Sequence, residues 1–117
     1  MNKIKPKILV FTRVYIPGFR AGGPIRTISN MVSRLSCDFE FRIVTQDRDD
    51  GSSLPYESIK ASEWHPVGGA QVYYLNRKDI SLLRLVALIN EQAPSVIYLN
   101  SFFDPIFTIR VLWARHL

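Results

Sequence analysis

Two adjacent glycines, Gly22 and Gly23, are the residues of this sequence best suited to do chemistry. Glycine lets a backbone come close to a bound group, and the free N–H groups at the start of a helix attract anions. Pro24 follows them, and proline suits the first helical position because its missing N–H would be unpaired there anyway. Arg26 adds a fork of N–H donors that fits phosphate. These residues predict a diphosphate-binding turn, although the same glycines would also serve a tight turn that binds nothing.

Other familiar site patterns are missing from the sequence. The glycines do not form G-x-G-x-x-G, which disfavours a dinucleotide, and we predict that the protein uses no cofactor. His65 and His116 are the only histidines and fall in different predicted elements, so no metal site is expected. Cys37 is the only cysteine, which excludes a disulfide framework, and we interpret it as a packing residue at a helix end.

Three aspartates and two aromatic residues lie in a long polar segment in the middle of the chain. Asp47, Asp49 and Asp50 are interpreted as a solvated turn, with acid–base chemistry or cation binding as the alternatives. Trp64 and Tyr56 are expected to pack against the core, with contact to a sugar as the alternative. Irregular segments of this length are uncommon inside a compact domain and often carry function.

Short apolar runs alternate with segments of helical periodicity. The runs predicted to be strands are 7–12, 40–45, 70–75 and 95–100. Helices are predicted over 24–36 and 80–92, because apolar residues three or four positions apart fall on one helix face. Asp104 is predicted to cap a third helix. The polar segment 46–69 is predicted to be an irregular loop.

This alternation predicts an α/β fold, a Rossmann-like parallel sheet with flanking helices. Right-handed crossovers favour the strand order 3-2-1-4. Ligands bind beyond the carboxyl ends of such strands where the order reverses, here between strands one and four. That arrangement places the loop from Arg13 to Gly23 next to Asn100, Ser101, Phe102 and Phe103. The fourth strand would be an exposed edge unless more chain covered it, so we expect an incomplete domain.

Composition and charge exclude several classes of protein. The 117 residues are 47% apolar and 21% charged, as in an ordinary globular protein. The net charge of +5 is spread without a dense basic run, so nucleic acid is not an expected partner. No apolar run approaches the roughly 20 residues that cross a bilayer. We predict a cytoplasmic protein; peripheral contact with the inner face of the membrane and simple solubility are both open explanations of the charge.

An ordered set of motifs runs along most of the chain. Tyr15-x-Pro17 is followed by Gly22-Gly23 and then Arg26. This order resembles the Y-x-P…G-G-x-x-R opening of the retaining, GT4-type glycosyltransferases of the GT-B fold. Later segments are similar to a bacterial subgroup of that family, namely 45–49, 55–56, 64, 72–75 and 94–103.

The resemblance implies that residues 1–117 belong to the N-terminal, acceptor-side domain of such an enzyme. That domain would be incomplete and inactive alone, with a C-terminal donor-binding domain as its intramolecular partner. The parent enzyme would transfer a sugar from a nucleotide sugar to a saccharide or lipid-linked acceptor in bacterial surface polysaccharide biosynthesis, without a metal. Gly22, Gly23 and Arg26 would bind the diphosphate and sugar of the donor.

The same resemblance assigns the acceptor to Asn100, Ser101 and Phe102. Many members of the family end this strand with a histidine pattern near the sugar, where this chain has Tyr98 and Asn100. Asparagine can hydrogen-bond a hydroxyl but does not titrate near neutral pH, and no catalytic residue is assigned. Two other classes stay open. One is a non-catalytic module that binds a phosphate ligand or a partner, and the other is a different Rossmann-like enzyme such as an epimerase or reductase.

Overall fold

The computed structural model describes residues 4–100 and builds them around a five-stranded sheet. The strands are β1 Lys7–Phe11, β2 Glu40–Gln46, β3 Trp64–Val67, β4 Ala70–Leu75 and β5 Val96–Leu99. The helices are α1 Gly22–Leu35, the short 3-10 helix η1 Arg77–Asp79, and α2 Leu82–Gln92. The α/β class predicted from the alternating pattern is therefore confirmed.

The sheet is mixed, which corrects the parallel sheet of order 3-2-1-4 predicted from the sequence. The observed order is β3-β4-β2-β1-β5, and β3 runs antiparallel to β4 while the other pairs are parallel. The four predicted strands follow one another as β4-β2-β1-β5, so the difference is the additional strand at the edge. β3 falls in the segment predicted to be an irregular loop. It has four residues and includes Pro66, which a strand tolerates at a sheet edge.

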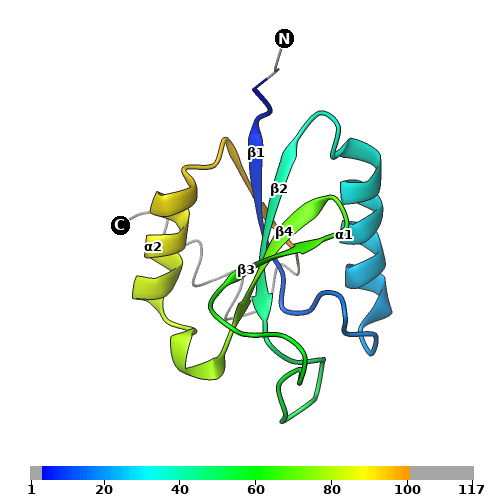
Figure 1. Cartoon of the computed structure of the whole chain (residues 1–117), viewed down its shortest axis with the longest axis vertical. Helices are drawn as coiled ribbons and strands as arrows, with labels where there is room; N and C mark the ends of the chain where they lie inside the picture. Colours follow the sequence, from blue (N-terminus) through cyan, green and yellow to red (C-terminus); the bar gives the residue numbers. More distant parts are fainter. Residues whose placement is uncertain (1–3, 101–117) are drawn as a thin grey trace.

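The helices α1 and α2 cover opposite faces of the sheet (Figure 1). Ile28 of α1 packs in one core cluster with Val10 of β1. Leu85 and Leu88 of α2 pack in a second cluster with Leu9 of β1. Successive strand residues point to opposite faces, so the central strand β1 supplies both cores. This double burial explains why its sequence is a continuous apolar run.

The helix boundaries differ slightly from the predicted ones. α1 begins at Gly22, two residues earlier than expected, so both glycines belong to its first turn. α2 begins two residues later, because the Ser81 hydroxyl accepts a hydrogen bond from the Arg84 N–H (3.2 Å) and caps the helix there. The helix predicted to start at Asp104 lies outside the described residues. Among residues 4–100, no helix is both long enough and apolar enough to cross a membrane.

Three predictions about single side chains are tested by the packing. Cys37 lies just beyond α1 but is exposed, so its interpretation as a packing residue is wrong. Trp64 packs against the α2-side core, with its ring centroid 5.2 Å from that of Tyr73. Tyr56 packs against the α1-side core. Core packing of both aromatic residues is confirmed.

Gly69 in the β3–β4 turn should be intolerant of a side chain. An added Cβ would lie 2.8 Å from both Cβ and Oγ of Ser36, at the end of α1. We expect Gly69→Ala to lower the free energy of unfolding by about 1–3 kcal/mol through overpacking, measured by urea denaturation.

Gly22→Ala is the matched control, because a Cβ there meets nothing within 4 Å. We expect this variant to keep wild-type stability or gain slightly, since alanine favours a helix. Combining Gly69→Ala with Ser36→Gly should recover much of the loss. Wild-type stability of Gly69→Ala, or no recovery in the double variant, would contradict the proposed clash.

Candidate functional site

The carboxyl ends of β1 and β5 lie side by side, where the strand order reverses. β1 and β5 pair in parallel, and the N–H of Asn100 donates to the carbonyl of Phe11 at 3.0 Å. The Asn100 amide nitrogen lies 3.4 Å from the hydroxyl of Thr12, the first residue after β1. Asn100 is thus beside the start of the loop after β1, where the sequence placed it. Ser101 and Phe102 lie outside the described residues.

The loop after β1, residues 12–21, is held by two tyrosine hydroxyls. Tyr74 of β4 donates to the carbonyl of Ile16 at 2.5 Å, and Tyr56 donates to the carbonyl of Tyr15 at 3.4 Å. Gly18 completes the turn, with its N–H on the same Tyr15 carbonyl at 2.9 Å. A Cβ on Gly18 would lie 2.6 Å from the Tyr56 hydroxyl oxygen, so only glycine fits this contact.

Burial keeps these hydroxyls in their donor form. It raises the pKa of Tyr74 far above its ordinary value, and the neighbouring tyrosines add to the effect. Burial, together with the negative charges of Asp49 and Asp47, raises the pKa of Tyr56 to about 12. Both groups therefore remain protonated at neutral pH and can donate throughout the ordinary pH range.

Asp49 binds the same loop through its backbone. Its carboxylate accepts the N–H of Phe19 at 3.1 Å and the N–H of Arg20 at 3.3 Å, as well as that of Asp50 at 2.8 Å. Burial acts to raise the pKa of Asp49, but these three N–H groups and the Arg20 charge outweigh it, so the pKa lies below its usual value. The N–H groups of this part of the loop thus already bind an anion of the protein itself, the carboxylate of Asp49.

A solvated turn is the wrong interpretation for Asp47 and Asp49. Their exposed fractions are 5% and 8%, because the segment that contains them folds back on itself. Asp47 accepts from Arg48 Nε at 2.9 Å, and Arg48 also donates to the carbonyl of Ser53 at 2.7 Å. The buried charges are paired, as buried charges must be, and serve to fix residues 46–56.

The first turn of α1 remains open to solvent. No side chain caps it, and Gly22 and Gly23 are exposed, with nothing within 4 Å of an added Cβ on either one. Arg26, one turn along, is also exposed. The aspartate that holds the preceding amides therefore does not occupy the glycine turn. This turn keeps the free N–H groups that an anion needs.

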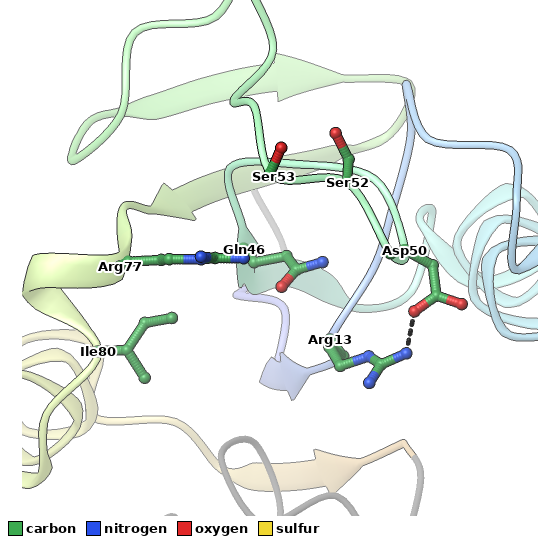
Figure 2. A pocket seen from close by; sticks show the side chains of 8 residues that line it. Arg13, Gln46, Asp50, Ser52, Ser53, Arg77 and Ile80 are labelled. Atoms are coloured by element: carbon green, nitrogen blue, oxygen red, sulfur yellow. Dashed lines mark hydrogen bonds and ion pairs between the residues drawn. The ribbon is translucent and has the colours of Figure 1, made fainter.

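An open cleft of about 610 Å³ lies at the carboxyl edge of the sheet (Figure 2). Its lining includes Arg13, Gln46, Asp50, Ser52, Arg77 and Ile80. Arg13 and Asp50 form an ion pair on one side, and Arg77 extends from the other side toward Gln46 (Figure 2). Two guanidinium groups against one carboxylate make the lining net positive. The cleft suits a ligand that carries both hydroxyls and negative charge.

The predicted site residues and the cleft occupy different places on this edge. Gly22, Gly23 and Arg26 do not line the cleft, and neither does Asn100. α1 belongs to the core cluster on one face of the sheet, whereas Ile80 of the cleft packs against the cluster on the other face. The structure thus separates an open helix terminus from a polar cleft.

Sequence reasoning missed the cleft residues, although a signal for them was present. Arg13 comes two residues after β1, Gln46 is the last residue of β2, and Arg77 comes two residues after β4. The carboxyl ends of parallel strands meet at one edge of a sheet, so polar residues at these three ends predict one shared site. The glycine turn follows the loop after β1, so the site predicted from the sequence included that loop with Arg13 but not the ends of β2 and β4.

A second, smaller hollow of about 280 Å³ lies between the loop after β1 and residues 46–56. Its walls include Pro17, Phe19, Arg20, Leu54 and Pro55. Phe19 and Leu54 are 79% and 74% exposed, and because both line the hollow they bring two exposed apolar side chains together. This hollow therefore combines an apolar rim with the opposite charges of Arg20 and Asp49.

Replacing the buried carboxylate should weaken the fold in a pH-dependent way. We expect Asp49→Asn to lower the free energy of unfolding at pH 7 by about 1–2 kcal/mol, because two loop N–H groups lose a charged acceptor. The stabilisation from a lowered pKa is complete above the unfolded value of about 3.9 and is lost as pH falls through the folded value. The gap between wild type and variant should therefore narrow below about pH 4.

Urea denaturation at neutral and acid pH measures this gap. Asp38→Asn, a change at an exposed carboxylate, is the control and should leave stability nearly unchanged at neutral pH. An Asp49→Asn gap that stays constant from neutral to acid pH would contradict a charge-dependent role.

Comparison with known proteins identifies no relative of this chain. No family model, no curated protein and no solved structure matches it at a significant level. A functional proposal therefore rests on the sequence motifs and on the geometry of the carboxyl edge.

Proposed function

We propose that this chain forms the acceptor-side, Rossmann-like part of a GT-B glycosyltransferase. The enzyme transfers a sugar from a nucleotide sugar to a saccharide or lipid-linked acceptor, in bacterial surface polysaccharide biosynthesis. One observation carries the proposal most: an uncapped helix terminus and a polar cleft of about 610 Å³ share the carboxyl edge of the sheet. A sugar transfer needs both, because a diphosphate leaves as a hydroxyl-bearing acceptor attacks.

The donor side of the proposal uses the glycine turn. The N–H groups of Gly22 and Gly23 stabilise the charge that develops on the leaving diphosphate, and Arg26 adds a guanidinium one helical turn away. Glycine is required because the diphosphate approaches the backbone closely. The nucleotide itself is held by a C-terminal donor-binding domain of the same protein. No cofactor or metal takes part.

The acceptor side uses the cleft and the end of β5. Gln46, Ser52 and Arg77 offer groups that hydrogen-bond sugar hydroxyls. Asn100, next to the loop after β1, offers a further amide to the acceptor, and the sequence assigns Ser101 and Phe102 to the acceptor as well. The segments that follow β2, β4 and β5 thereby bring the acceptor to the edge where the donor diphosphate binds.

A peripheral contact with the inner face of the cytoplasmic membrane accompanies this function. The exposed Phe19 and Leu54 rim the smaller hollow, and Arg20 lies in the same wall. Apolar side chains that enter the headgroup boundary, next to a cation that pairs with anionic lipids, are suited to such contact. A lipid-linked acceptor would then be presented near the cleft.

A non-catalytic binding module is the second candidate. Among the described residues that line the cleft, Asp50 is the one carboxylate, and it is paired with Arg13. Within residues 4–100, no histidine lines the cleft. Such a lining can bind a phosphate-bearing or acidic ligand without offering a free acid or base. Ligand binding without sugar transfer by the complete protein would favour this candidate.

Gly23→Ala tests the donor role in the complete glycosyltransferase. A Cβ at position 23 meets nothing within 4 Å, so the fold should be retained while the diphosphate is held away from the backbone. We expect transfer to fall by about 100-fold, with an unchanged thermal unfolding midpoint. The assay follows transfer from a panel of nucleotide sugars. Asn30→Ala, an exposed change on the same helix, should transfer normally. Wild-type transfer by Gly23→Ala would remove the glycine turn from the mechanism.

Co-sedimentation with lipid vesicles tests the membrane contact. We expect the full chain to bind vesicles of phosphatidylglycerol and phosphatidylcholine, and the double variant Phe19→Ser/Leu54→Ser to lose most of that binding. Leu83→Ser is the matched control, because Leu83 is 81% exposed but lies on α2, away from the hollow. Equal binding by wild type and double variant, or equal loss in the control, would refute the contact.

A further inference from the structure

Arg77 is a cation of the cleft whose guanidinium group is available to a ligand. Its side chain is exposed and, within residues 4–100, has no ion pair or hydrogen bond. Arg13, by contrast, is paired with Asp50 on the other side of the cleft. Figure 2 shows Arg77 extended into the space between η1 and Gln46 rather than turned away from it. An arginine held in this way presents its donors to whatever enters the cleft.

The backbone beneath Arg77 is fixed. The Asn76 side-chain oxygen accepts the N–H of Asp79 at 2.9 Å and so caps η1. The carboxylate of Asp79 accepts the Ser62 hydroxyl at 2.6 Å, which ties η1 to the chain before β3. Ile80, immediately after η1, packs against the α2-side core. Arg77 therefore starts from a rigid position, which lowers the entropy lost when its side chain binds a ligand.

Gln46 supplies the complementary acceptor. Its side-chain nitrogen donates to the carbonyl of Arg48 at 2.9 Å and points less closely at that of Asp49, at 3.4 Å. These bonds orient the amide, and among the described residues no donor pairs with its oxygen Oε1. Figure 2 shows this oxygen on the side of the cleft between Arg13 and Arg77. A hydroxyl of a ligand can donate to it.

We propose that the cleft selects an acidic saccharide. A carboxylate or phosphate oxygen pair accepts two N–H bonds from Arg77, and a neighbouring sugar hydroxyl donates to Oε1 of Gln46. Planar oxyanions and guanidinium groups match in this two-bond geometry, which gives direction as well as charge. As the identity of the acceptor, this inference rests on the proposed glycosyltransferase. As a binding property of the cleft, it stands without that function.

Calorimetric titration of the full chain with glucuronate, glucose 6-phosphate and glucose tests the proposal. We expect both anionic sugars to bind about tenfold or more tightly than glucose, a difference near the strength of one charged hydrogen-bond pair. The two anionic probes distinguish the sources of the charge. Preference for one of them names carboxylate or phosphate as the natural group.

Arg77→Gln should remove the preference for anionic sugars while the circular dichroism spectrum stays unchanged. Lys78→Gln is the matched control, because Lys78 is an exposed cation of the same turn that does not line the cleft, and it should keep the preference. Equal affinity for all three sugars, no binding of any, or the same loss in both variants would overturn the proposal.

Transfer assays separate this inference from the proposed function. Arg77-dependent binding of acidic sugars by a complete protein that transfers no sugar would support the cleft and refute the glycosyltransferase. Transfer to neutral acceptors alone, unaffected by Arg77→Gln, would support the glycosyltransferase and overturn the selection of an acidic saccharide.

Discussion

The candidate site depends on the hydrogen bonds that the buried carboxylate of Asp49 accepts from the backbone. This carboxylate accepts backbone N–H groups of Phe19 and Arg20 and so joins the loop after β1 to the segment after β2. A buried carboxylate is costly unless N–H groups or cations surround it. Here two of the N–H groups that surround the carboxylate come from a loop thirty residues away in the sequence, so the hydrogen bonds hold the two loops together. The neighbouring buried pair of Asp47 and Arg48 fixes the second loop internally.

The backbone N–H groups at the carboxyl edge fall into two sets, those bound by the Asp49 carboxylate and those without a side-chain acceptor. Those of Phe19 and Arg20 are already occupied, whereas the first turn of α1, at Gly22 and Gly23, has no side-chain cap. Among the residues that the structure describes, the first turn of α1 is therefore where we expect an anion to bind on the α1 side. The cleft with Arg77 lies at the same carboxyl edge, and its residue Ile80 packs against the α2-side core. The helix terminus and the cleft, the two sites proposed to bind ligands, thus share the edge where ligands of open α/β sheets bind.

The fold was predictable from the sequence to the extent that periodicity determines it. The apolar run of β1 and the spaced apolar residues of both helices gave the α/β class and four strands in their relative positions. β3 was missed because four residues that include Pro66 resemble a loop, and only pairing with β4 makes them a strand. The burial of Asp49 was missed for a related reason. Local composition marks three nearby aspartates as solvated, whereas two of the N–H groups that bind Asp49 come from Phe19 and Arg20 in a loop distant in sequence.

We propose, as the central claim, that a diphosphate binds the amides of the glycine turn and not those held by Asp49. The most direct measurement is a ¹⁵N–¹H spectrum of the full chain titrated with pyrophosphate, with sodium chloride at matched ionic strength as reference. We predict saturable shifts of the Gly22 and Gly23 amide signals, while those of Phe19 and Arg20 stay in place. Unmoved glycine signals at saturating pyrophosphate, or shifts centred on Phe19 and Arg20, would contradict the claim.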